Sequence, residues 1–131
     1  MSETPDGAPH VPRPIRVLVV DDDHDGADSL CVMLGMHGHQ CRVAYDACAA
    51  LAEAESFRPE VALLDLGMPV SGYDLARELL LRERPPILVA LTGYCDEDRR
   101  QRAAEGGFGH YLVKPAHPND VLGVLACVAA R

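Results

Sequence analysis

A chain of 131 residues, 48% hydrophobic and 24% charged, has the size and composition of one globular domain, which excludes disordered and fibrous classes. Its formal net charge of -8 argues against nucleic acid as a partner, because phosphate backbones attract Lys and Arg. No apolar run approaches the roughly 20 residues of a membrane helix, so we expect no membrane contact. There is no charged-then-apolar leader after Met1, and the five cysteines form no C-x-x-C pair. We therefore predict a cytoplasmic protein with free, mostly buried thiols.

The chain begins with a proline-rich segment and then alternates apolar runs with amphipathic stretches. The first fourteen residues hold Pro5, Pro9, Pro12 and Pro14 and have no apolar period, which predicts a flexible tail. From Ile15 onward, short apolar runs typical of buried strands appear at regular intervals. The predicted strands are Arg16–Val20, Cys41–Ala44, Val61–Leu64, Ile87–Leu91 and Phe108–Val113.

Helical patterns follow each predicted strand. Capping residues, a capping box of Ser71 with Asp74 and a proline at residue 118 mark where helices begin. Glycines at 35–38 and 106–107 mark where two of them end. The predicted helices begin near Asp23, Asp46, Ser71, Asp96 and Pro118.

Strand and helix therefore alternate five times, and right-handed crossovers then require a parallel sheet with helices on both faces. In such sheets, ligands bind at the carboxyl ends of the strands, where the strand order reverses. Polar residues stand at these ends. They are Asp21 and Asp22 after the first strand, Asp65 after the third, Thr92 after the fourth and Lys114 after the fifth. We expect all of them to meet in one cleft.

Three carboxylates in one cleft must either raise a pKa or recruit a cation, since two unit charges ~4 Å apart repel by roughly 4 kcal/mol at an effective dielectric of 20. Oxygen ligands without His or Cys point to a hard ion. Magnesium (Mg2+) suits them best, because it binds through one or two carboxylates and keeps waters that a substrate phosphate can replace. A lysine and a hydroxyl at the same place complete a site for a phosphoryl group.

The sequence blocks at these strand ends resemble those of CheY-like response-regulator receivers. They read VVDD at 19–22, LLDLGMP at 63–69, ALTG at 90–93 and YLVKP at 111–115. The match is ordered and correctly spaced along the chain, which makes it specific. LTGY, together with ADSL in the first helix, is similar to receivers associated with hybrid histidine kinases.

This resemblance implies a flavodoxin-like (βα)5 three-layer sandwich with a five-stranded parallel sheet in the order 2-1-3-4-5. It places a receiver domain at 15–131, after a tail at 1–14. It implies a role in two-component phosphorelay signalling, in which a sensor kinase, a hybrid histidine kinase or a histidine phosphotransfer protein supplies the phosphoryl group. The receiver catalyses only its own phosphorylation and dephosphorylation and is otherwise no enzyme. The downstream target is a protein that the sequence does not identify.

The resemblance also assigns roles at the metal and phosphorylation site. Asp65 is the expected phosphoacceptor, attacking a phosphohistidine to form an aspartyl phosphate. Asp22 and Asp65 are the expected direct magnesium ligands, the backbone carbonyl of Gly67 is a third, and Asp21 acts through water.

Further roles fall on the later strands. Lys114 and Thr92 are expected to hold phosphoryl oxygens, and Tyr111 to move from exposed to buried and so change the face of the last strand and last two helices. The Lys114–Pro115 bond is expected to be cis. Gly67 and Tyr94, two residues beyond the acceptor and the switch threonine, are expected to tune the phosphoryl lifetime.

Two other functions are considered. A degenerate receiver would act only as a binding module, but the intact acid pair, acceptor, threonine and lysine argue against this. A phosphatase of the haloacid-dehalogenase type needs a second Asp two residues after the nucleophile, and Gly67 stands there. Tyr111 could also be a plain strand aromatic, and the arginines at 99, 100 and 102 a solvated helix face.

Overall fold

The computed structural model describes residues 13–68, 71–93 and 96–130. Strands and helices alternate throughout these residues, as the sequence predicts, and the second strand begins one residue earlier than expected. The elements are β1 (Arg16–Val20), α1 (His24–Met36), β2 (Gln40–Ala44), α2 (Ala47–Phe57), β3 (Val61–Asp65), α3 (Gly72–Leu80), β4 (Ile87–Thr92), α4 (Glu97–Glu105), β5 (Phe108–Val113) and α5 (Pro118–Ala129).

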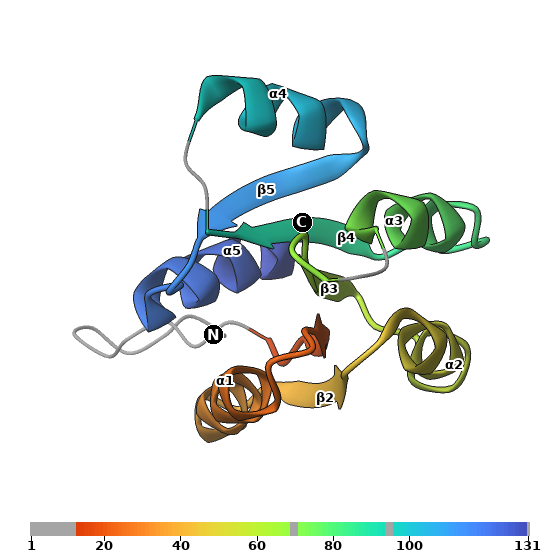
Figure 1. Cartoon of the computed structure of the whole chain (residues 1–131). Coiled ribbons are helices and arrows are strands. Elements are labelled where there is room, and N and C mark those ends of the chain that lie inside the picture. The colour runs from red at the N-terminus through yellow and green to blue at the C-terminus, as the bar shows by residue number, and fades with distance from the viewer. Residues whose placement is uncertain (1–12, 69–70, 94–95, 131) are drawn as a thin grey trace.

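The strands form one parallel sheet in the order β2-β1-β3-β4-β5, which confirms the flavodoxin-like fold. Helices α1 and α5 pack on one face, where Leu34 and Leu125 join the buried valines of the sheet. Helices α2, α3 and α4 pack on the other, where Ala50, Leu79 and Ala103 do the same. The three layers are visible in Figure 1. The strand order reverses between β1 and β3, so a crevice is expected there.

Side-chain caps begin every helix. Asp23 accepts a hydrogen bond from the Gly26 N–H, which confirms that it caps α1, and Asp46 caps α2 in the same way. Ser71 caps α3, but the carboxylate of Asp74 pairs with Arg77 at 3.2 Å. The remaining caps are Asp96 for α4 and His117 for α5.

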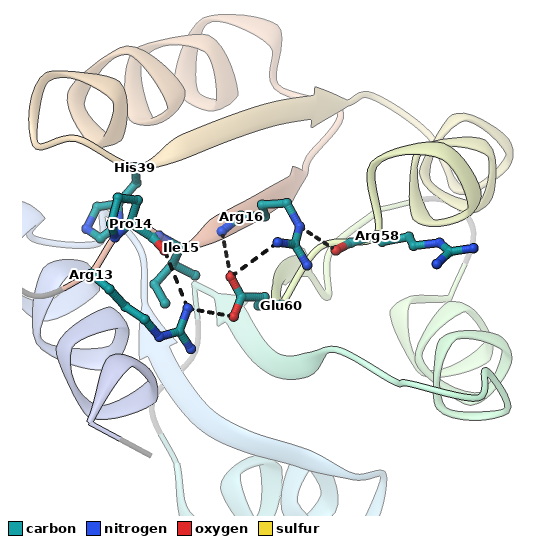
Figure 2. A network of polar contacts seen from close by, with 7 residues as sticks. All are labelled: Arg13, Pro14, Ile15, Arg16, His39, Arg58 and Glu60. Atoms are coloured by element: carbon teal, nitrogen blue, oxygen red, sulfur yellow. Dashed lines mark hydrogen bonds and ion pairs between the residues drawn. The ribbon is translucent and has the colours of Figure 1, made fainter.

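A polar network closes the end of the sheet opposite to the predicted site (Figure 2). Glu60 accepts hydrogen bonds from the Arg13 guanidinium at 2.8 Å and from the Arg16 backbone N–H at 3.2 Å. Next to it, the buried His39 accepts a hydrogen bond from the Ile15 N–H through Nδ1, at 3.1 Å. Burial opposes the charge of Glu60, but its bonds to Arg13 and Arg16 outweigh this and lower the pKa of that carboxyl. Residues 1–12 of the expected tail lie outside the described part, so the domain boundary stays a prediction.

The cysteines differ in part from the prediction. Cys31, Cys41, Cys48 and Cys127 are free thiols, but Cys48 and Cys127 are exposed, because they lie on the outer faces of α2 and α5. Cys31 and Cys41 are half-buried, so the prediction of mostly buried thiols was wrong: none of the four described thiols is fully buried. Cys95 lies outside the described residues. Of the helices that the structure describes, none has the length and apolar character that crossing a membrane requires.

Candidate phosphorylation and metal site

Backbone hydrogen bonds beyond the strand ends position the residues of the site. The Asp21 N–H donates to the Ala44 carbonyl at 3.1 Å, so β1 stays paired with β2 one residue past its end. The Lys114 N–H donates to the Thr92 carbonyl at 2.7 Å and does the same for β5 on β4. These backbone hydrogen bonds therefore fix where the side chains of Asp21 and Lys114 leave the sheet, independently of any side-chain contact.

The predicted acid cluster forms at this edge. Asp21, Asp22 and Asp65 each offer a carboxylate oxygen, and these oxygens lie within 4.8 Å of one another. Asp21 and Asp65 are buried, with 4% and 6% of their surfaces exposed, whereas Asp22 is exposed. The sequence prediction of one cleft holding these residues is thus met by the geometry. An open acidic site of this kind, with oxygen donors only, fits a hard divalent cation.

Lys114 joins the acid cluster from β5. Its ammonium nitrogen lies 2.7 Å from an Asp21 oxygen and 3.2 Å from an Asp65 oxygen. Two backbone donors hold the remaining oxygens, since the Asp23 N–H donates to Asp21 at 3.0 Å and the Gly67 N–H donates to Asp65 at 2.8 Å. One cation and two amides thus face three carboxylates, which leaves a net negative charge in the cleft.

The two buried carboxyls are shifted in opposite directions. Burial raises the pKa of Asp65, the nearby Asp21 carboxylate raises it further, and the Gly67 N–H offsets only part of this. Burial also opposes the charge of Asp21, but the bonds from Lys114 and the Asp23 N–H lower its pKa overall. Burial likewise opposes the charge of Lys114, and the two carboxylates outweigh it and raise the pKa of the ammonium. Of the two buried carboxyls, Asp65 is therefore the one whose charge the protein stabilises less.

A close approach by α3 shapes the back of the site. A Cβ on Gly72 would lie 2.8 Å from the Leu66 Cδ2 and 3.3 Å from the Asp65 carbonyl oxygen, so a side chain there needs its neighbours to move. The first turn of α3 can pack directly behind Asp65 because this residue is glycine. Gly67 is exposed on the opposite side, and a Cβ there would stand 3.3 Å from an Asp65 carboxylate oxygen.

The remaining predicted site residues lie on β4 and β5. Thr92 is buried at the end of β4, and the Lys114–Pro115 peptide is cis, as predicted. Tyr111 is half-buried on β5, and the Arg100 guanidinium carbon lies 5.1 Å from the centre of its ring. All three arginines of α4 are exposed, as predicted for a solvated face, and Arg100 also covers the ring of Tyr111. Tyr94 lies outside the described residues.

Sequence reasoning missed the backbone donors and a neighbouring cavity. The backbone amides of Asp23 and Gly67 could not be predicted as donors, because the identity of a residue does not show in which direction its backbone N–H points. A cavity of about 500 Å³ opens beside the site between α1 and α5. It is lined by both polar groups of the site and apolar side chains, among them Asp21, Leu30, Met33, Lys114 and Pro115.

The response regulator receiver domain is the family whose model matches this chain, over residues 17–126. An uncharacterized 14.6 kDa protein of Leptolyngbya boryana is 40% identical over 110 residues, which cover 81% of this chain and 83% of that protein. The DNA-binding response regulator MtrA of Mycobacterium tuberculosis is 35% identical over 108 residues, 82% of this chain but only 47% of MtrA. This chain thus spans about half the length of its mycobacterial relatives.

Solved structures agree with these sequence comparisons. The chemotaxis response regulator CheY4 of Vibrio cholerae superimposes with a TM-score of 0.81 at 27% identity, covering 88% of this chain and 99% of CheY4. A CheY-like receiver domain protein of Methanospirillum hungatei gives a TM-score of 0.81 at 26% identity, covering 90% and 95% of the two chains. The family model spans residues 17–126, a range that holds all four of the blocks at the strand ends. The chain belongs to the response regulator receiver domain family, whose members act in two-component phosphorelay signalling.

Proposed function

We propose that Asp65 accepts a phosphoryl group from a phosphohistidine on a histidine kinase or a histidine phosphotransfer protein. The observation that carries this proposal is the setting of its carboxylate. It is buried, it is held by the Gly67 N–H at 2.8 Å, and it faces Lys114 at 3.2 Å within the acid cluster. One oxygen of Asp65 is fixed by the amide, so the other is left to attack phosphorus in a defined direction.

The transfer exchanges one bond to phosphorus for another. An Asp65 oxygen forms the new P–O bond as the P–N bond to the donor imidazole breaks, and the imidazole leaves with the electron pair and takes up a proton from solvent. Lys114 lies within reach of the same space and would donate a charge-assisted hydrogen bond to a phosphoryl oxygen. Thr92 would donate a hydrogen bond from its hydroxyl to another.

Magnesium fits the acid cluster on the chemistry of its donors. Asp22 and Asp65 would bind it directly, with the Gly67 carbonyl, while Asp21 would act through water and stay paired with Lys114. The three carboxylates exceed the single lysine in charge, which favours a divalent cation. When bound, magnesium neutralises charge on the transferring phosphoryl group.

The output of the switch would be a change of protein surface. Thr92 would draw its loop toward the phosphoryl group, Tyr111 would turn inward, and the face formed by α4, β5 and α5 would change. Such a switch works when phosphorylation shifts the free-energy difference between the inactive and the active conformation by only about 1–3 kcal/mol. Gly67 and Tyr94 would set the rate at which water reaches the aspartyl phosphate.

The partners follow from the same chemistry. The chain would act on no substrate other than its own phosphoryl group, and its targets would be proteins. Nucleic acid is not proposed as a partner, because the net charge of -8 opposes binding to phosphate backbones. We place the protein in the cytoplasm, since the four described cysteines are free thiols, as in a reducing compartment.

Transfer of labelled phosphoryl from a purified phosphohistidine kinase tests the proposal. Wild type should become labelled in the presence of magnesium, and Asp65→Asn should not, because the amide is no nucleophile. Asp74→Asn is the matched control, since Asp74 is exposed on α3 and, among the described residues, pairs with Arg77 across one helical turn. Equal labelling of wild type and Asp65→Asn would overturn the assignment.

Beryllofluoride distinguishes a working switch from a binding module. It mimics the phosphoryl group on a carboxylate, so the wild type should give a magnesium-dependent change in tyrosine fluorescence. A spectrum that stays the same, with or without magnesium, would favour a domain that only binds its partners.

A further inference from the structure

A tyrosine just beyond the end of β2 contacts the first turn of α1. The ring of Tyr45 stacks on the ring of His24, the first residue of α1, with the two centroids 3.7 Å apart and the planes inclined by 17°. Its hydroxyl donates a hydrogen bond to the Asp28 carboxylate at 2.5 Å, a length typical of a bond to a charged oxygen. His24 and Asp28 are four residues apart and so lie on the same side of α1. One side chain therefore holds the start of the helix at two points.

Tyr45 itself has a fixed place in the fold. The residue before it, Ala44, accepts the Asp21 N–H through its carbonyl at 3.1 Å. The residue after it, Asp46, caps α2 and accepts the Ala49 N–H at 2.7 Å. The Tyr45 side chain is half-buried and packs against the core on the α1 face of the sheet. Because its backbone is held by the sheet on one side and by a helix cap on the other, the ring is a rigid support for α1.

The start of α1 needs such a support. The helix lies beside β2, the edge strand of the sheet, as Figure 1 shows. Its buried residues are Ala27 and Leu34. Leu34 anchors the far end of the helix, whereas Ala27, in the first turn, buries no more than a methyl group. The ring of Tyr45 therefore supplies a large contact at the point where α1 has a small buried side chain.

The connection between β1 and α1 carries two of the acids of the site. It consists of Asp21, Asp22 and Asp23 and leads directly into His24. The start of this connection is fixed by the hydrogen bond of Asp21 to β2, and its end is fixed by the first turn of α1. Asp22 lies between these two points and is exposed, so its backbone on both sides sets the direction of its carboxylate. A shift of the first turn of α1 therefore moves the Asp22 carboxylate relative to that of Asp65.

We propose that Tyr45 is a positioning residue for the metal site. This role rests on the proposed function of the acid cluster, in which Asp22 binds magnesium directly. Tyr45 holds the first turn of α1 against β2 through His24, and that turn holds the Asp22 carboxylate toward the carboxylate of Asp65. Because magnesium demands a near-octahedral set of oxygens, a small displacement of one ligand weakens binding.

Titration of the full chain with magnesium, followed by isothermal calorimetry, tests this role. Tyr45→Leu loses both the stack and the bond to Asp28, so its Kd for magnesium should rise about tenfold, the usual effect of losing a residue that orients a metal ligand. Tyr45→Phe keeps the stack and should give a Kd between those of wild type and Tyr45→Leu. The matched control is Phe57→Leu, which loses an aromatic contact with Arg42, at 5.0 Å, at the far end of α2. This control should bind magnesium like the wild type.

Substitutions of His24 show whether the stacked rings carry the effect. His24→Phe keeps an aromatic ring against Tyr45 and should bind magnesium like the wild type, whereas His24→Leu should bind it more weakly. The double substitution His24→Leu with Tyr45→Leu should be no weaker than Tyr45→Leu alone, because both changes break the same contact. Losses that multiply in the double variant, or equal losses in His24→Phe and His24→Leu, would overturn the stack as the means of positioning.

Hydrogen exchange of the metal-free protein gives a second readout. The Ala27 N–H donates to the Asp23 carbonyl at 2.9 Å in the first turn of α1, so its protection should fall in Tyr45→Leu and stay unchanged in Phe57→Leu. If the wild type binds magnesium and Asp22→Asn does not, an unchanged Kd in Tyr45→Leu overturns the role of Tyr45 alone. A wild type that binds no magnesium overturns the proposed metal site and the role of Tyr45 with it.

Discussion

Lys114 is bound more closely to Asp21 than to Asp65, the residue it is expected to assist. Its ammonium nitrogen is 2.7 Å from the former carboxylate and 3.2 Å from the latter. Asp21 is buried, so Lys114 is its main source of neutralising charge. The lysine therefore holds the acidic cleft together, in addition to any contact with a phosphoryl group.

Replacing Lys114 with Met should lower the free energy of unfolding by about 2 kcal/mol in metal-free buffer, because three carboxylates then face one another without a cation. Magnesium should restore part of this loss and should bind more tightly than to the wild type. Urea unfolding with EDTA and with magnesium measures both effects. Arg77→Met, which breaks an exposed pair, is the control and should cost at most about 0.5 kcal/mol. Equal stability of Lys114→Met and wild type without metal would contradict this account.

Asp65→Asn should stabilise the metal-free protein by about 1 kcal/mol at pH 7 while abolishing phosphorylation. The pKa of Asp65 is raised, so the native state binds its proton more tightly than the unfolded state does, and the ionised form costs stability. That cost grows as the pH rises through the folded-state pKa and vanishes in acid. In thermal unfolding, Asp65→Asn should thus have a higher unfolding temperature than the wild type at pH 7, and this difference should shrink toward pH 3. A gain of equal size in Asp74→Asn would mean that the effect is not local to the cleft.

Gly72→Ala should slow phosphorylation and destabilise the domain by about 1–2 kcal/mol, since the new methyl group would press on Leu66 and the Asp65 carbonyl. Leu66 is half-buried and its terminal methyl is the nearest atom, so Leu66→Ala in the same chain should recover part of both losses. Gly35→Ala, where the space is open, should not destabilise. Labelling rates and urea unfolding test this. If the double substitution is no better than Gly72→Ala, the contact with Leu66 is not the cause.

The site could be predicted from the sequence to the extent that it depends on strand ends. Asp21, Asp65, Thr92 and Lys114 each follow an apolar run, and a parallel sheet must bring such residues to one edge. The strand order itself came from family resemblance, since alternation alone fixes the parallel sheet and not which strand lies at its edge.

Features that depend on packing could not be predicted. The closer pairing of Lys114 with Asp21 arises from side-chain geometry inside the cleft. His39 is also buried, because the turn after α1 brings its ring within hydrogen-bond distance of the Ile15 N–H at the start of β1.

His39 makes the domain sensitive to acid at the end of the sheet far from the phosphorylation site. Its exposed fraction is 7%, and its Nδ1 accepts the Ile15 N–H at 3.1 Å, so only the neutral ring can make this bond. Burial, and then the charge of nearby His37, lower the pKa of His39. The unfolded chain, with an ordinary histidine pKa of about 6.5, therefore takes up a proton before the native state does.

The contribution of neutral His39 to the free energy of unfolding should be fully present above about pH 7. It should fall as the pH drops through 6.5 toward the folded-state pKa, by about 1–2 kcal/mol in total. His39→Gln keeps an acceptor for the Ile15 N–H but cannot be protonated, so it should remove this part of the pH dependence. Between pH 7 and pH 5, its free energy of unfolding should therefore fall by less than that of the wild type. Urea unfolding at pH 5, 6 and 7 measures the difference, and His110→Gln, on the opposite edge strand, is the control. Parallel pH profiles for His39→Gln and wild type would show that the buried ring is not the acid-sensitive group.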